Sequence, residues 1–220
     1  DYISSKLKKR IPNYKHHIIL NGEYLEIDYK NNKTEIKAKG KYSLNDKFDN
    51  YEINIINQKN KYHFESSINL KNNPLIIEEI DYNKSKNSSS TVKLKGNYIK
   101  NKDIKIEQAI YSEDKNKIAI SNLQLSKDYK IKDIDALELN YLNKNKKLNF
   151  LKKSKIKDKY LLTGEHFDGE SLVKNLLGGD SNNSFLKVFK NLNSEIEINL
   201  DNFYSGNKSN LNSIEGKIFV

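Results

Sequence analysis

The sequence predicts an all-β protein, built as a long antiparallel meander with one or two short helices near residues 168–190. Three observations predict this fold. Apolar and polar residues alternate with period 2 through most of the chain, polar runs separate the alternating stretches, and no long helical pattern lies between them. Parallel neighbours need a crossover of a dozen or more residues, so the short separators favour antiparallel pairs.

The alternating stretches are the predicted strands. Each places Ile, Leu, Val, Tyr, Phe or Ala on one face and mainly Lys, Glu, Asn or Gln on the other, which predicts a sheet with one dry face and one wet face. In chain order they are Leu25–Tyr29, Ile36–Ala38, Tyr51–Ile55, Tyr62–Phe64, Val92–Leu94, Ile104–Ile106, Ile118–Ile120, Leu123–Leu125, Leu137–Tyr141, Leu148–Phe150 and Ile196–Leu200.

The separators are rich in Asn, Lys, Asp, Ser and Gly, as in Lys30–Lys33, Asn57–Asn60 and Asn83–Ser90. Strands start roughly every 10–15 residues, which is close to hairpin spacing. One segment differs, because Phe167–Gly179 has apolar residues at helical intervals, with Asp168 as a predicted N-cap and Gly178 as a predicted C-cap. Ser184–Lys190 is a candidate for a second short helical turn.

A short pattern recurs along the chain: an apolar residue, a spacer, Gly, a spacer and then a bulky residue. Its glycines are Gly40, Gly96, Gly164 and Gly216, out of 9 glycines in the chain. Glycine inside a strand often marks a bulge or bend, so the recurrence predicts one structural unit that is used repeatedly.

Composition limits the possible functions. Lys plus Arg is 39 and Asp plus Glu is 29, giving a net charge of +10, but Arg10 is the only arginine. Nucleic-acid binders usually use arginine for bidentate contacts, so we interpret the lysine-rich runs Lys6–Arg10 and Leu151–Lys157 as solvated faces or loops. An anionic membrane surface or lipid head group is the alternative partner for them.

No catalytic or metal-binding pattern is found. His16, His17, His63 and His166 lack metal-site spacing, there is no cysteine, and no nucleophile or phosphate-binding motif is present. The sequence therefore predicts no enzyme activity, no cofactor, no metal and no nucleic-acid partner. The chain starts at Asp1 and has no methionine. We expect one elongated β-domain over residues 1–220, a fragment of a longer chain, with a possible sub-boundary near 165–192.

The order of elements over residues 60–220 resembles AsmA-like envelope proteins of the TamB and YhdP group. In that family a strand ends in Gly-x-x-aromatic/Leu-Asp, leads into a short helix and is followed by a charged strand. The segments that carry the resemblance are Pro74–Ile77, Leu94–Gly96, Ile118–Leu125, Gly164–Leu177, Leu192–Leu200 and Leu211–Ile218.

The resemblance implies a curved open sheet, or β-groove, in a periplasmic protein anchored to the inner membrane through a segment outside this chain. It implies a non-catalytic role in outer membrane biogenesis, in which phospholipid is carried or scaffolded between the two membranes. The implied partners are phospholipid acyl chains and envelope membrane proteins. The candidate groove residues are Ile36, Ile53, Ile55, Val92, Leu94, Ile104, Ile106, Ile118, Ile120, Leu137, Leu139, Ile196 and Ile198.

A second hypothesis is a structural or adhesive β-sandwich or repeat module of a surface protein. In that case a second sheet would bury the apolar face completely. The position of the alternating isoleucines separates the hypotheses, because a shared open trough favours lipid and burial between two sheets favours the sandwich.

Overall fold

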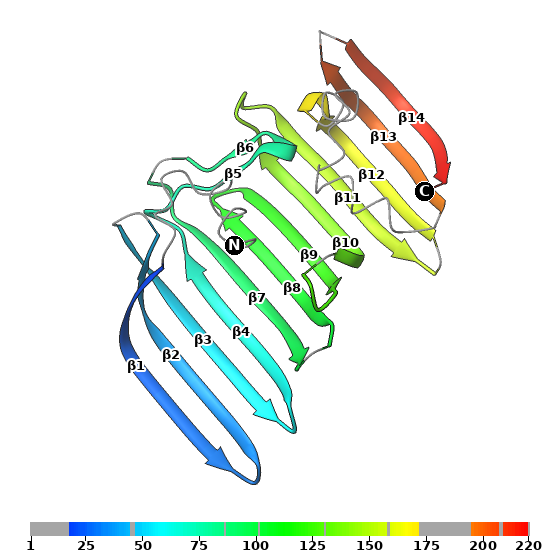
Figure 1. Ribbon diagram of the computed structural model, residues 1–220. Helices are drawn as coiled ribbons and strands as arrows, with labels where there is room; N and C mark the ends of the chain where they lie inside the picture. The colour runs from blue at the N-terminus through cyan, green and yellow to red at the C-terminus, as the bar shows by residue number, and fades with distance from the viewer. Residues whose placement is uncertain are drawn as a thin grey trace.

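The computed structural model describes residues 18–44, 47–85, 87–100, 102–129, 131–157, 159–171, 195–206 and 209–219. They form one sheet of twelve strands, drawn in Figure 1 from blue β1 to red β14, and a two-stranded sheet, β5–β6, beside it. The predicted all-β class is confirmed. The predicted helices at 168–190 and the sub-boundary at 165–192 lie mostly outside the described residues.

The strands follow the predicted alternating stretches and extend them. They are β1 (Ile19–Lys30), β2 (Lys33–Ser43), β3 (Phe48–Gln58), β4 (Lys61–Asn69), β5 (Ile76–Ile77), β6 (Tyr82–Asn83), β7 (Ser90–Ile99), β8 (Ile104–Glu113), β9 (Asn116–Leu125), β10 (Ile131–Leu142), β11 (Leu148–Ile156), β12 (Lys159–Asp168), β13 (Glu195–Gly206) and β14 (Ser209–Phe219). A 3₁₀ turn, η1 (Glu78–Ile80), lies between β5 and β6.

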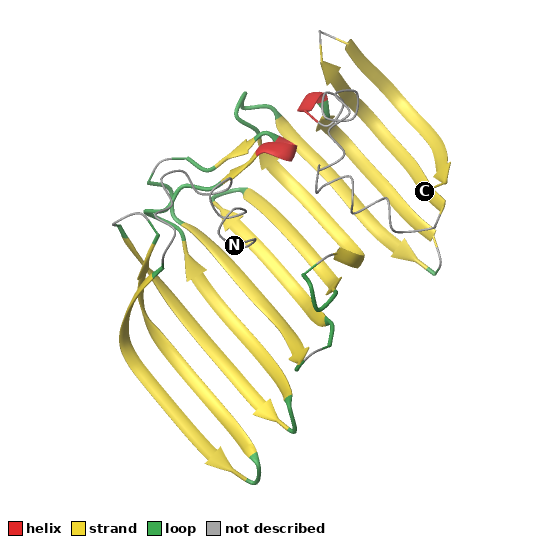
Figure 2. Cartoon of the chain, viewed as in Figure 1, coloured by secondary structure: helices red, strands yellow, loops and turns green. Residues whose placement is uncertain are grey.

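The large sheet is open. Its order is β1-β2-β3-β4-β7-β8-β9-β10-β11-β12-β13-β14, so β1 and β14 each have one neighbour. Figure 2 shows the strands side by side, with the segment that holds β5 and β6 (residues 70–89, called the connector below) at one end of them. A meander of this kind brings alternate hairpin turns to the same long edge of the sheet.

One pair departs from the predicted antiparallel meander. β12 and β13 are parallel, with Tyr160 opposite Ile196 and Asp168 opposite Tyr204. The two strands therefore start at the same edge of the sheet. The sequence pattern does not reveal this parallel pair, because alternation along a strand carries no information about its direction.

Two hairpins have two-residue turns in the left-handed region, the conformation that matches the twist of paired strands. The φ angles are 53° and 58° at Asn31 and Asn32, and 49° and 64° at Lys59 and Asn60. Asparagine tolerates this region better than most residues, which explains the Asn-rich separators.

The recurring glycines have a common cause at three of their four positions. Gly40, Gly96 and Gly164 each lie where the register with a neighbouring strand shifts. A Cβ atom there would lie 2.3, 2.3 and 2.6 Å from a carbonyl oxygen of the neighbouring strand, respectively. Gly216 is different, since a Cβ on it would meet nothing within 4 Å.

Candidate functional site

The candidate site is the apolar face of the large sheet. Cross-strand registers place its side chains in rows that run across the strands. The middle row runs through Leu25, Ala38, Ile53, Ser66, Leu94, Ala109, Ile120, Leu137, Lys153, Leu162 and Ile198. A second row runs through Ile27, Ile36, Ile55, Phe64, Gly96, Ile106, Leu123 and Ile134.

The predicted groove residues differ in burial along the sheet. From β2 to β9 they are partly exposed: Ile36, Ile53, Ile55, Val92, Leu94, Ile104, Ile106, Ile118 and Ile120. Further along, Leu137, Leu139 and Ile196 are buried and Ile198 is partly buried. The open part of the apolar face therefore lies on β1–β9, and we call it the open face.

The connector covers one end of this face. Its Leu70, Ile80 and Tyr82 belong to the same buried cluster as Tyr111 and Leu139 of the large sheet. The Tyr82 ring meets those of Tyr111 and Tyr141 edge-on, with centroids 5.5 and 5.7 Å apart. The Tyr141 hydroxyl also donates to the Ile80 carbonyl oxygen at 2.7 Å. Sequence patterns do not predict this contact, because it joins residues far apart in the chain.

A buried carboxylate attaches the connector to β8. Glu113 accepts hydrogen bonds from the hydroxyls of Tyr82 and Ser88, from the Ser85 backbone N–H at 2.9 Å and from the Asn116 amide at 3.2 Å. Burial raises the pKa of the Glu113 carboxyl, but the hydrogen bonds outweigh it, and the net shift is downward. Among the described residues this is the most extensively hydrogen-bonded side chain, and its role is structural.

A buried lysine interrupts the middle row. Lys153 has 0% of its surface exposed. Its ammonium donates to the Ile134 carbonyl oxygen at 2.6 Å and lies 4.0 Å from the centre of the Tyr160 ring. Burial lowers the pKa of Lys153 to about 8. The interpretation of 151–157 as a fully solvated run is therefore wrong at this residue.

Asp133 lies beside Lys153 and is held by two other groups. It accepts hydrogen bonds from the Lys155 ammonium at 2.7 Å and from the Tyr160 hydroxyl at 2.5 Å. Burial raises the pKa of Asp133, but these two donors shift it below its usual range. The Asp133 carboxylate therefore stays ionised beside the buried, poorly solvated ammonium of Lys153.

The predicted face of one strand is also wrong. Alternation places Leu148 and Phe150 on the apolar face, but Leu148 is 52% exposed and Asn149 is 0% exposed. Asn149 is buried because its side chain accepts a hydrogen bond from the Asp168 N–H at 2.6 Å and donates to the Lys147 carbonyl at 3.0 Å. Because β11 alternates without interruption, Leu151 and Lys153 lie on the same buried side as Asn149.

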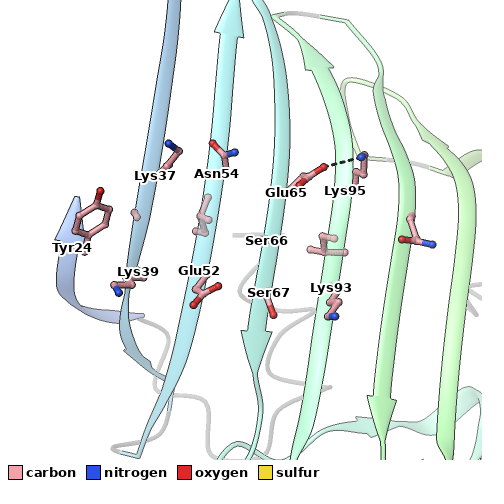
Figure 3. Close-up of a pocket in the computed structure, with 14 residues that line it drawn as sticks. Tyr24, Lys37, Lys39, Glu52, Asn54, Glu65, Ser66, Ser67, Lys93 and Lys95 are labelled. Atoms are coloured by element: carbon pink, nitrogen blue, oxygen red, sulfur yellow. Dashed lines mark ion pairs between the residues drawn. The ribbon is translucent and has the colours of Figure 1, made fainter. Parts of the chain in front are cut away.

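The opposite face of β1–β8 is polar. Figure 3 shows two rows of side chains there: Lys37, Asn54, Glu65 and Lys95, and beside them Tyr24, Lys39, Glu52, Ser67 and Lys93. Between the rows lies a shallow hollow of about 490 Å³, and Glu65 pairs with Lys95 at 2.8 Å. Each row has one glutamate among its lysines, so the charges around this hollow are mixed.

The described residues contain no group of three or more His, Cys, Asp or Glu side chains placed to hold a metal ion. In the same part of the chain, no helix has the length and apolar character needed to cross a membrane. No family model matches the chain, and no curated protein or solved structure matches it significantly.

Proposed function

We propose that this chain is a non-catalytic, lipid-binding segment of an AsmA-like envelope protein, and that its open face holds phospholipid acyl chains. The supporting observation is the open face itself. Its aliphatic and aromatic rows continue across neighbouring strands, yet the only second sheet among the described residues is the two-stranded β5–β6. In the structural or adhesive alternative a second sheet would cover the rows.

The size and chemistry of the open face suit an acyl chain. Strands lie about 4.8 Å apart, so the rows from β2 to β9 extend about 24 Å. A leaflet of the bilayer core is about 15 Å thick, so an acyl chain fits within the open face. Each CH₂ moved from water to an apolar surface contributes about 0.8 kcal/mol. Ligand binding therefore comes from burial, without a directional polar group.

In the proposed setting the chain lies in the periplasm, tethered to the inner membrane by a segment outside it, and works with envelope membrane proteins. Its place in outer membrane biogenesis would be to carry or scaffold phospholipid between the two membranes. The open sheet supports this role, because a face that is open along the rows lets a chain slide from strand to strand.

The test is lipid binding by the purified chain. Native mass spectrometry should find phospholipid bound to the wild type, and Ile55→Asp, which places a charge in the open rows, should lower the bound fraction at least fivefold. Asn54→Asp adds a carboxylate to the other face of the same strand and should bind like the wild type. Circular dichroism checks that both variants are folded. The proposal would be contradicted if the purified protein were lipid-free and its melting temperature did not change on adding phospholipid. Equal lipid binding by the two folded variants would also contradict it.

A further inference from the structure

One long edge of the large sheet is lined by lysines. The five hairpin turns at this edge connect β1 to β2, β3 to β4, β7 to β8, β9 to β10 and β11 to β12. We call this the lysine edge, and Figure 1 shows its turns following one another along the sheet. Its described lysines are Lys30, Lys33, Lys59, Lys61, Lys100, Lys102, Lys127, Lys157 and Lys159. Only Asp103 and Asp128 oppose them among the described residues of these turns.

Most of these lysines are available to a ligand. Lys33 pairs with Glu35 at 3.6 Å and Lys159 with Glu195 at 3.2 Å. The other seven are exposed and have no ion-pair partner within the described part of the chain. Successive hairpins repeat about every 10 Å across the sheet, because each adds two strand spacings. The edge is therefore a row of positive charge that follows the rows of the open face.

The open face meets this edge directly. The row of side chains next to the turns runs through Tyr29, Thr34, Asn57, Tyr62, Tyr98, Ile104, Leu125 and Ile131, so it is interrupted by polar residues only on β2 and β3. The rings of Tyr62 and Tyr98 lie 6.0 Å apart, and both side chains are partly exposed. Tyrosine and lysine together at the border of an apolar surface are typical of the interface between acyl chains and water.

The other long edge differs. The connector covers the apolar face there, and its Lys84 is buried, with its ammonium donating to the Lys71 and Ser85 carbonyl oxygens at 3.2 Å. Nearby, Lys144 pairs with Asp81 at 2.6 Å and Lys147 with Asp168 at 3.1 Å. Lys47, Lys71, Lys115 and Lys146 are also exposed at this edge, but the apolar face beside them is covered by the connector. Within the described part of the chain, unpaired lysines therefore adjoin uncovered apolar rows at the lysine edge.

We infer that the lysine edge binds the phosphate head groups of anionic phospholipids whose acyl chains lie on the open face. This inference rests on the proposed function and adds the ligand's head-group class and orientation. Lys61 is five positions from Ser66 in the middle row, which is about 17 Å along a strand. That distance is close to the thickness of one leaflet, about 15 Å, so a tail reaches the middle row with its phosphate at the turns. Nucleic acid also carries phosphate, but it would leave the aliphatic rows without a partner.

The experiment compares vesicles of phosphatidylcholine with vesicles containing 30% phosphatidylglycerol with the same acyl chains. The lysine-edge variant K59Q/K61Q/K100Q/K102Q is matched by K47Q/K71Q/K115Q/K146Q, which removes four exposed lysines at the other edge. Wild type should bind the anionic vesicles at least tenfold more tightly than the zwitterionic ones. The affinity for anionic vesicles should fall at least fivefold in the lysine-edge variant and less than twofold in the control variant.

The controls separate this inference from the proposed function. Native mass spectrometry measures acyl-chain binding with phosphatidylcholine alone, where the lysine-edge variant should equal the wild type. If the chain takes up both lipids equally and the two quadruple variants bind anionic vesicles alike, the head-group inference fails and acyl-chain binding stands. If neither lipid is taken up, the proposed function fails as well. The inference would also be overturned if the wild type bound a single-stranded oligonucleotide more tightly than anionic vesicles and the lysine-edge variant lost that oligonucleotide binding.

Discussion

The Tyr82 hydroxyl donates a hydrogen bond to the carboxylate of Glu113, and this contact joins the connector to the large sheet. The two residues are 31 positions apart, and both are buried. The same carboxylate also accepts from Ser85, Ser88 and Asn116. Because every one of these partners is a donor, the site is suited to a charged carboxylate and poorly suited to a group that itself donates.

Glu113→Gln should therefore destabilise the fold. The glutamine amide keeps one acceptor oxygen but turns an N–H₂ group toward donors, which leaves buried polar groups unsatisfied. We expect a loss of about 2–3 kcal/mol in the free energy of unfolding, measured with urea. Asp114→Asn, at the exposed neighbouring position, should change it by less than about 0.5 kcal/mol. Similar losses in the two variants would show that the network contributes little.

Because of Lys153, the free energy of unfolding should increase as pH rises above 8. Its pKa falls from 10.5 to about 8 on burial, so between these values the unfolded chain binds more protons than the folded one. The unfavourable burial of charge is complete below pH 8 and is relieved as pH rises. The free energy of unfolding should increase by about 1 kcal/mol per pH unit between pH 8.5 and 9.5.

The variant Lys153→Met isolates this effect, since other groups also titrate at high pH. It should remove the increase, while Lys152→Met, at the exposed neighbour, should keep it. Chemical denaturation at several pH values measures both. An unchanged slope in Lys153→Met would assign the pH dependence to another group.

Gly96 and Gly216 test the structural reason for the recurring glycine. A Cβ at Gly96 would lie 2.3 Å from the Lys105 carbonyl oxygen and 2.8 Å from the Phe64 ring, and backbone must move to admit it. Gly96→Ala should cost about 2 kcal/mol of stability. Gly216→Ala has free space and should gain about 0.5 kcal/mol, because alanine restricts the unfolded chain. Equal effects on the urea midpoint would mean that close approach is not the cause.

Much of this fold could be predicted from local pattern. Alternation in stretches such as Tyr51–Ile55 identifies strands because successive side chains of a strand point to opposite faces. The pattern failed at Leu148–Phe150, where hydrogen bonds to Asn149 decide which side is buried. It also failed at Lys153, whose place in the apolar row is set by its partner Leu137 on β10. The connector's contacts and the parallel β12–β13 pair depend on tertiary structure, which alternation does not encode.

Lys59 is a candidate for stabilisation at a turn. It has a φ of 49° in the left-handed region, where a long side chain is strained and asparagine is tolerated. The equivalent position in the first hairpin, Asn31, is already asparagine with a φ of 53°. Lys59→Asn should raise the free energy of unfolding by about 0.5–1 kcal/mol. Asn60→Val, which places a β-branched residue at a φ of 64°, should lower it. A loss of stability in Lys59→Asn would contradict this account of the turn.

The edge strand β1 should promote self-association. Its unpaired backbone edge can pair with another chain, and Leu25 and Ile27 on its apolar side are 66% and 62% exposed. Ile27→Lys adds one positive charge on the apolar side and should shift the chain toward monomer in sedimentation velocity, with its circular dichroism unchanged. Asp28→Asn changes the net charge by the same amount on the other side of the strand. It should associate like the wild type, because the apolar contact that drives association is intact. If both variants shifted equally toward monomer, net charge would control association, and the apolar side of β1 would not.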